Sequence, residues 1–199
     1  IGLRCERMGN SSLQFSGGIF RGEELLVSGE LIYVFADPAT QTSRSVPQAL
    51  RDTLAAFEAG ESMVTLSVGD WGELGEAARQ VRTEVFVREQ RIPVELEWDE
   101  DDATAVHAVV RNRLGMPVAT GRLLRHEARV ARIGRMAVSR VLRGGGLGRD
   151  ILQALMHAAQ QRGDQSVVLH AQCSAGGFYE RLGFEAEGAV FEEAGIAHR

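Results

Sequence analysis

The chain has 199 residues, 44% of them hydrophobic, which is enough apolar material for one large core or two small ones. Its formal net charge of -5 argues against nucleic acid as the main partner, because phosphate binding requires a basic face. It has no apolar run long enough to cross a bilayer and no evident signal peptide. We therefore expect a cytoplasmic protein that binds neither nucleic acid nor membrane.

Cysteine and lysine usage narrows the possible chemistry. The two cysteines, Cys5 and Cys173, cannot form a disulfide framework, and no Cys-x-x-Cys spacing offers a zinc site, so we expect no metal. All 22 basic residues are arginine, which excludes a Walker lysine, a Schiff-base lysine and a lysine general base.

The first sixty residues read as an antiparallel meander. Strands are predicted over 3–8, 12–20 and 25–35, with turns between them. A helix is expected to begin after Pro47, with Leu50, Leu54 and Phe57 on one face. The composition changes at 59–62, so we place a domain boundary there and expect domains at 1–60 and 61–199.

The remaining residues alternate between strand and helix patterns, which indicates an α/β (α+β) fold. A strand over 63–68 precedes a helix over 72–90, on which Leu74, Ala78, Val81 and Val85 form one stripe. Three strands and a helix then lead to Gly163, a typical C-terminal stop. In chain order, these and the last predicted elements are strands 105–111, 117–126 and 129–138, helix 147–162, strand 166–171, helix 177–182 and a final strand from Phe184.

The junction between the strand ending at Val138 and the helix beginning at Leu147 is rich in glycine. Four of the six residues 143–148 are glycine, at positions 144, 145, 146 and 148. Because glycine has no Cβ, successive backbone N–H groups can converge on an oxyanion beside the positive end of the helix. A Rossmann fingerprint fails here, because Arg149 or Ile151 stands where its third glycine belongs. A pyrophosphate is the expected ligand; the alternative is a turn that only caps the helix.

The order Arg143-x-x-Gly146-x-Gly148 resembles the pyrophosphate loop of the GCN5-related N-acetyltransferases (GNAT), which bind coenzyme A there. Downstream, 178–184 resembles the tyrosine-bearing helix and following Gly-Phe of that superfamily, and the segments 85–90 and 193–198, with Asp99, Asp102 and His107, resemble its ElaA-type branch. The likeness spans about 63–199 and implies a mixed sheet flanked by helices.

The resemblance also implies roles for individual residues. Tyr179 would give a proton to the departing thiolate, and the backbone N–H of Val138 would stabilise the oxyanion. Acetyl-CoA would be held by Met136, Ala137, Val138, Arg143, Gly144, Gly145, Gly146, Leu147, Gly148 and Arg149.

Each of these acid and base candidates has an alternative reading. Tyr179 could be a core aromatic. Glu89 lies four residues after Val85 on one helical face and is a candidate general base, but it could equally be a solvated carboxylate. His107 sits in an apolar strand and is expected to be a satisfied core histidine. The segment 95–102 holds six acids, which could attract a cationic amine or simply be solvated, although Trp98 indicates packing.

The run 28–37, followed by Val46, Pro47 and a helix, resembles the C-terminal half of hotdog-fold acyl-CoA thioesterases. The family's central helix and catalytic carboxylate precede this point and are absent from the sequence. We expect the missing half upstream of Ile1 or in another polypeptide, and a homo-oligomer formed through this sheet is possible.

The sequence therefore predicts an N-acetyltransferase that moves an acetyl group from acetyl-CoA to an amine by direct attack in a ternary complex. Direct attack is favoured because Cys173, the only nucleophile nearby, has no evident base partner. Two other functions stay open: a non-catalytic acyl-CoA-binding sensor or scaffold, and an acyl-CoA thioesterase with an appended CoA-binding domain.

Overall fold

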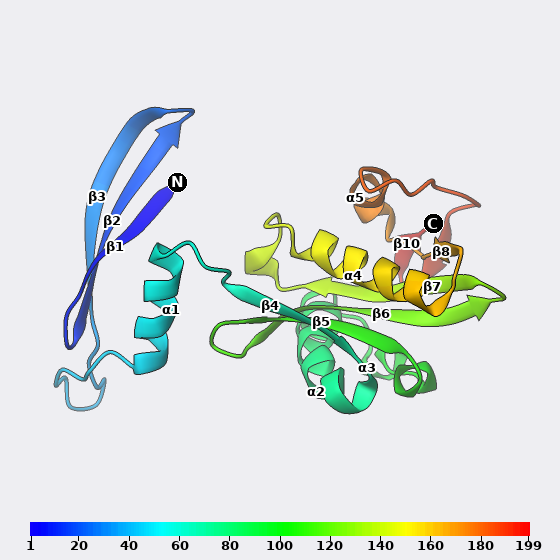
Figure 1. The fold of residues 1–199 in the computed structure, drawn as a ribbon, viewed down its shortest axis with the longest axis horizontal. Helices are drawn as coiled ribbons and strands as arrows, with labels where there is room; N and C mark the ends of the chain where they lie inside the picture. The colour runs from blue at the N-terminus through cyan, green and yellow to red at the C-terminus, as the bar shows by residue number, and fades with distance from the viewer. The chain divides into compact units, whose positions relative to one another are not determined.

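The computed structural model describes all residues, 1–199, which form two compact units, Ile1–Met63 and Val64–Arg199 (Figure 1). None of its helices combines the length and the apolar character needed to span a bilayer.

The first unit is a three-stranded antiparallel sheet followed by one helix. The sheet has the order β1-β2-β3, and helix α1 begins after Pro47, whose fixed φ suits a helix start. Near α1, Leu13, Val46 and Ala56 are buried, and the backbone N–H of Cys5 donates to the carboxylate of Glu58 at 2.7 Å. The elements are β1 (Gly2–Met8), β2 (Ser12–Arg21), β3 (Glu24–Val34) and α1 (Gln48–Glu58).

One face of this sheet is apolar and largely exposed. The strand register places Phe15 opposite Leu31 and Ile19 opposite Val27, so these side chains share a face. Leu31 is 50% exposed and Val27 is 58% exposed. The unit contains no helix around which the sheet wraps, so it does not establish a hotdog fold.

The second unit is a mixed α/β structure. Its five-stranded sheet has the order β4-β5-β6-β7-β8, in which the first four strands pair antiparallel and β7 pairs parallel with β8. The elements are β4 (Val64–Gly69), α2 (Trp71–Arg82), the π-helix η1 (Thr83–Glu89), α3 (Val94–Glu97), η2 (Glu100–Ala103), β5 (Val106–Asn112), β6 (Pro117–Glu127), β7 (Val130–Val138), η3 (Arg140–Leu142), α4 (Leu147–Arg162), β8 (Ser166–Val168), η4 (Cys173–Ala175), α5 (Gly176–Glu180), β9 (Phe191–Glu193) and β10 (Ile196–His198).

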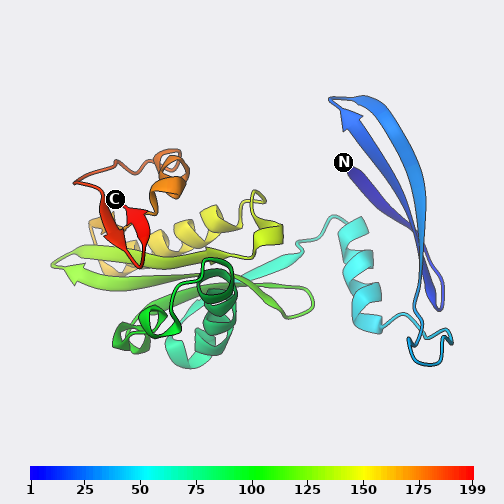
Figure 2. The ribbon, with the colours of Figure 1, turned by 180° about the vertical axis from the view of Figure 1, so that it is seen from behind.

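Helices α2 and α4 cover opposite faces of the sheet (Figures 1 and 2). Because strand side chains alternate, Ala108 and Val110 of β5 pack on the α4 side with Ile151 and Leu155, whereas Val109 packs with Leu74, Ala77 and Ala78 of α2. Close approach of α4 requires Gly121, since a Cβ there would lie 2.7 Å from Ile151 Cγ2. The predicted flanked mixed sheet is confirmed.

Three elements differ from the sequence prediction. The strand predicted over 166–171 is shorter, because β8 ends at Val168. The helix predicted over 72–90 is α-helical only to Arg82 and continues as a π-helix, where the N–H of Gln90 donates to the Val85 carbonyl five residues back (3.0 Å). The strand predicted from Phe184 was wrong. Residues 184–190 form no strand, Gly188 among them has a left-handed φ of 78° that interrupts an extended segment, and the C-terminal strands form a separate hairpin, β9-β10.

Strand β7 contains a bulge and then separates from β8. Thr120 pairs with Ala137 and Arg122 pairs with Gly134, so β7 holds one extra residue there, and Arg135 has a positive φ of 50°. The β7–β8 ladder stops at Arg132, so the rest of β7 has a neighbour only on its β6 side. This open edge runs directly toward the glycine-rich junction.

Candidate active site

The glycine-rich junction is built by left-handed backbone. Gly144 and Gly146 have φ values of 83° and 93°, which side-chain-bearing residues rarely adopt. The first backbone bond of α4 runs from the N–H of Asp150 to the Gly146 carbonyl (3.1 Å), so the amides of Leu147, Gly148 and Arg149 have no acceptor within the helix. Together with the positive end of the helix, they form a site suited to an anion.

The surroundings of the junction leave room for a ligand on one side. A Cβ added at Gly144 would meet no atom within 4 Å, whereas one at Gly148 would lie 3.4 Å from Phe178 of α5. Leu147 points into the core, and Arg149 stays at the surface, where its guanidinium is 3.4 Å from Asp150. The residues present therefore fit a diphosphate held by backbone amides.

Val138 ends the open edge of β7. The N–H of Ser139 donates to the Val118 carbonyl of β6 (2.9 Å), and neighbouring amides of a strand point in opposite directions, so the Val138 N–H faces the open edge. Met136, two residues earlier, presents its backbone to the same edge, and Ala137 between them is buried against Val81 and Val85. The predicted oxyanion donor thus faces the gap that β8 leaves.

Glu89 and Arg143 form a two-point ion pair. Arg143 Nη1 and Nη2 donate to the two carboxylate oxygens of Glu89 at 2.6 and 2.7 Å, and Arg143 Nε donates to the Val138 carbonyl at 3.0 Å. The hydrogen bonds from Arg143 lower the pKa of Glu89. A carboxylate stabilised in this way accepts a proton less readily, which supports a positioning role; the base role of Glu89 stays a prediction.

Tyr179 lies between two cavities. It packs edge-on against Phe178 and Phe184, with ring centroids 4.9 and 5.9 Å away, and burial raises its pKa to about 12. The smaller cavity, of about 280 Å³, is also lined by Met136 of the open edge. The larger one, of about 1120 Å³, lies beside α4. Tyr179 is thus both a core aromatic and a cavity-lining phenol.

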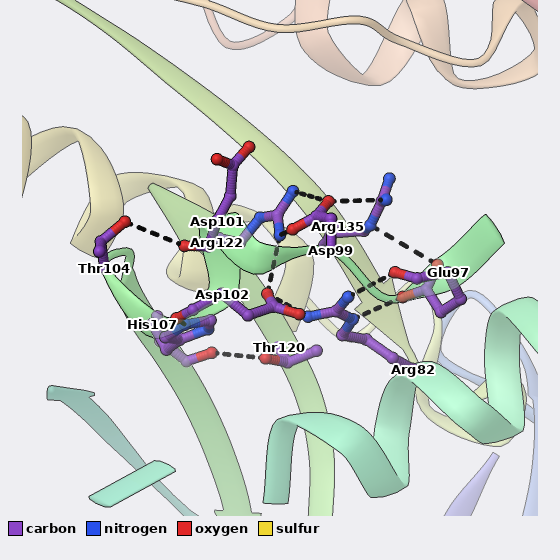
Figure 3. Close-up of polar contacts among 11 residues, drawn as sticks. Arg82, Glu97, Asp99, Asp101, Asp102, Thr104, His107, Thr120, Arg122 and Arg135 are labelled. Atoms are coloured by element: carbon purple, nitrogen blue, oxygen red, sulfur yellow. Dashed lines mark hydrogen bonds and ion pairs between the residues drawn. The ribbon is translucent and has the colours of Figure 1, made fainter. Parts of the chain in front are cut away.

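A buried ion cluster forms part of the smaller cavity's wall (Figure 3). Asp102 Oδ1 accepts from Arg82 Nη1 (2.7 Å) and Arg122 Nη1 (2.8 Å). Asp99 accepts from both Arg122 and Arg135, and its hydrogen bonds and charge contacts with arginines outweigh the opposing effect of burial, so its pKa is lowered. Three arginines thus face three carboxylates, since Glu97 completes the cluster.

Glu97 is the most enclosed carboxylate of this cluster. Its Oε1 accepts from Arg82 Nε, and its side chain is only 3% exposed. Burial raises the pKa of Glu97 despite the neighbouring guanidinium of Arg82. Trp98, next in the chain, has the Arg82 guanidinium 4.6 Å above its ring.

The acidic segment is therefore not a solvated loop. Glu97 and Asp102 are buried against arginines, Asp99 is more exposed but also pairs with arginine, and Glu95 and Glu100 are exposed. The packing indicated by Trp98 is confirmed. His107 is confirmed as a satisfied core histidine, because it is 1% exposed and its Nε2 donates to the Asp102 carbonyl at 2.9 Å. No group of three or more His, Cys, Asp or Glu side chains is arranged to hold a metal ion.

Sequence reasoning missed four other residues that line the smaller cavity. Gln90, after the π-helix, and Gln172, after β8, form a reciprocal amide pair, with the shorter bond at 3.0 Å, and both line the smaller cavity. His170 and His198 line it too. Gln90 and His198 belong to the segments that carry the family resemblance, which was the only signal for them.

The open edge of β7 and the glycine-rich junction together form a site that can hold an extended ligand ending in a diphosphate. Residues 76–199 match the model of the acetyltransferase (GNAT) domain. The uncharacterized N-acetyltransferase YjcF of Bacillus subtilis is 37% identical over 119 residues, which cover 59% of this chain and 84% of YjcF.

Solved structures give the same result. Escherichia coli ElaA superposes with a TM-score of 0.62 at 29% identity, covering 68% of this chain and 97% of ElaA. An acyl-CoA N-acyltransferase from Pseudomonas aeruginosa superposes with a TM-score of 0.61 at 32% identity, covering 68% and 95%. The chain belongs to the GNAT acetyltransferase family, with ElaA-like structural neighbours, and is an acyltransferase of that type.

Proposed function

We propose that the chain is an N-acetyltransferase that transfers an acetyl group from acetyl-CoA to an amine by direct attack in a ternary complex. The observation that carries this proposal is the open edge of β7, which leads from the cavity beside Tyr179 to the unbonded amides of the glycine-rich junction. The Pseudomonas aeruginosa relative is named for acyl-CoA-dependent N-acylation, which agrees with this donor.

The chain's own groups would hold the donor at three places. Amides of 144–149 would bind the diphosphate, and the backbone of Met136 and Val138 would pair with the pantetheine arm as an added strand does. Arg143, fixed by Glu89 and by the Val138 carbonyl, would hold the glycine-rich junction and the end of β7 in place relative to each other. When bound, acetyl-CoA supplies an acetyl thioester beside the Val138 N–H.

Two groups would then serve the reaction itself. The Val138 N–H faces the open edge and would stabilise negative charge on the thioester oxygen. Because burial keeps the phenol of Tyr179 protonated through the physiological range, its proton is available for the departing sulfur.

The experiment is a measurement of thiol release from acetyl-CoA with and without an amine. The panel comprises spermidine, benzylamine, glucosamine, an aminoglycoside and a peptide with a free N-terminus. Amine-dependent release, with the acetylated product identified by mass spectrometry, is the expected result. Release without any amine would favour the thioesterase function instead, and binding without release would favour the sensor function.

A further inference from the structure

An amine acceptor is mostly a cation at neutral pH and must lose a proton before its nitrogen can attack. The cavity beside Tyr179 contains the groups that could take this proton. Glu193, one of its three carboxylates, is exposed at the end of β9, and the other two are poor candidates because arginines occupy their lone pairs. Glu97 is bound by Arg82, and Asp99 is bound by Arg122 and Arg135.

His198 of β10 differs from these carboxylates in its hydrogen bonding. Its Nδ1 lies 2.8 Å from the carbonyl oxygen of Ile196. A carbonyl oxygen only accepts hydrogen bonds, so Nδ1 must carry the proton in the neutral ring. The lone pair of the neutral imidazole is therefore on Nε2, the nitrogen that can accept a proton.

The imidazole is also held in place from several sides. It stacks on Phe191 at 5.8 Å with an interplanar angle of 25°, and Phe191 meets His170 edge-on at 5.0 Å. His198 forms a backbone bridge with Gln172, and the next residue, Arg199, exchanges two backbone hydrogen bonds with Ala171 (2.8 and 2.9 Å). The ring thus has a fixed position on the cavity wall.

We propose, on the basis of the proposed function, that His198 is the general base that deprotonates the acceptor amine. Nε2 takes the ammonium proton and passes it to solvent. The C–N bond then forms as the C–S bond breaks, Tyr179 protonates the sulfur, and the proton left on the nitrogen returns through solvent to Tyr179. The net change is one acetyl transfer and one proton released for each cationic amine consumed.

Charged groups around His198 define its electrostatic setting. Glu193 of β9, His170 after β8, and Arg132 and Arg135 of β7 line the same cavity. Glu97 and Asp99, which are paired with arginines in the ion cluster, also line it. Because Nε2 must be free of a proton to act as the base, the protonated form of His198 should be inactive.

The kinetic test uses His198→Ala, with His126→Ala, an exposed histidine of β6 that lines neither cavity, as the matched control. The acceptor is benzylamine or whichever panel amine reacts fastest. We expect His198→Ala to lower kcat/KM for the amine by about 100- to 10,000-fold, to leave acetyl-CoA affinity unchanged and to lose the acidic limb of the pH profile. Added imidazole should restore at least part of the rate to this variant alone. Unimpaired turnover, or a loss that imidazole does not relieve, would overturn the proposal.

A second measurement does not depend on turnover. In wild-type protein labelled with ¹⁵N-histidine, a spectrum at pH 8 should show His198 protonated at Nδ1, with the signal assigned by its absence in His198→Ala. Protonation at Nε2 would overturn the proposal whatever the activity. Inactivity of the wild type toward every amine would instead count against the proposed function, so the two failures are distinguishable.

Discussion

Arg143 and Glu89, 54 residues apart in the chain, are joined by two hydrogen bonds of 2.6 and 2.7 Å. The same guanidinium binds the Val138 carbonyl, so one side chain connects the end of the π-helix, the end of β7 and the start of the glycine-rich junction. The contact links the segment where the acyl donor's diphosphate would lie to the strand edge where its thioester would lie.

Replacing Glu89 with Gln should weaken acetyl-CoA binding. Loss of a charged hydrogen-bond pair leaves Arg143 free to move, which we expect to raise the Kd about tenfold. Glu84→Gln is the control, because Glu84 forms an exposed pair with Arg88 only. Isothermal titration calorimetry measures both. An unchanged Kd together with a reduced kcat and a lost acidic limb would instead support the base role of Glu89.

Tyr179→Phe should separate catalysis from binding. Removing the hydroxyl removes the proton donor but keeps the ring packed against Phe178 and Phe184. We expect kcat to fall by about 100-fold or more with acetyl-CoA affinity retained. Tyr33→Phe, which changes the other tyrosine of the chain, should have no effect. Equal rates for Tyr179→Phe and the wild type would exclude the acid role.

The raised pKa of Tyr179 also predicts an alkaline loss of stability. The phenol ionises near pH 10 in the unfolded chain but at about 12 in the folded one, so the unfolded state loses its proton first. The stabilising contribution of Tyr179 is fully present below pH 10. The free energy of unfolding should fall by about 3 kcal/mol as the pH rises from 10 through 12. Urea unfolding at pH 9 and 11 tests this, and the decline should be smaller in Tyr179→Phe. Burial also raises the pKa of the Cys5 thiol, so the comparison with Tyr179→Phe is what isolates the contribution of Tyr179.

The buried ion cluster should contribute strongly to folding. Asp102→Asn removes the charge shared by Arg82 and Arg122 and leaves both guanidiniums enclosed, which should lower the free energy of unfolding by about 3 kcal/mol. Asp101→Asn is the control, since Asp101 is 55% exposed and meets only Arg132, at 3.6 Å. We expect a change of less than about 0.5 kcal/mol there. Similar losses of unfolding free energy in both variants would contradict the larger contribution that we assign to the buried carboxylate of Asp102.

Features set by local sequence were the ones that the sequence predicted well. Apolar periodicity located strands β1 to β7 and helix α4, and Gly163 marked the end of that helix with a φ of 92°. The glycine-rich junction was predictable because its conformation depends on adjacent residues. The change from α2 to a π-helix at Thr83 leaves the apolar stripe almost unaltered, so periodicity could not reveal it.

Features set by distant contacts could not be predicted. Nothing near Glu89 indicates that Arg143 will bind it, and the acids of 95–102 gave no sign of which would be buried by Arg82 and Arg122. Similarly, the position of His198 depends on a hairpin that pairs with Gln172. In each case the partner comes from another element, and only the folded sheet brings the two together.

The most direct test of the account is a crystal structure of the chain with acetyl-CoA. The account predicts the diphosphate within hydrogen-bond distance of the amides of 144–149, with the pantetheine arm along β7 from Val138 toward Met136. A donor bound elsewhere, or no donor bound at saturating concentration, would contradict it.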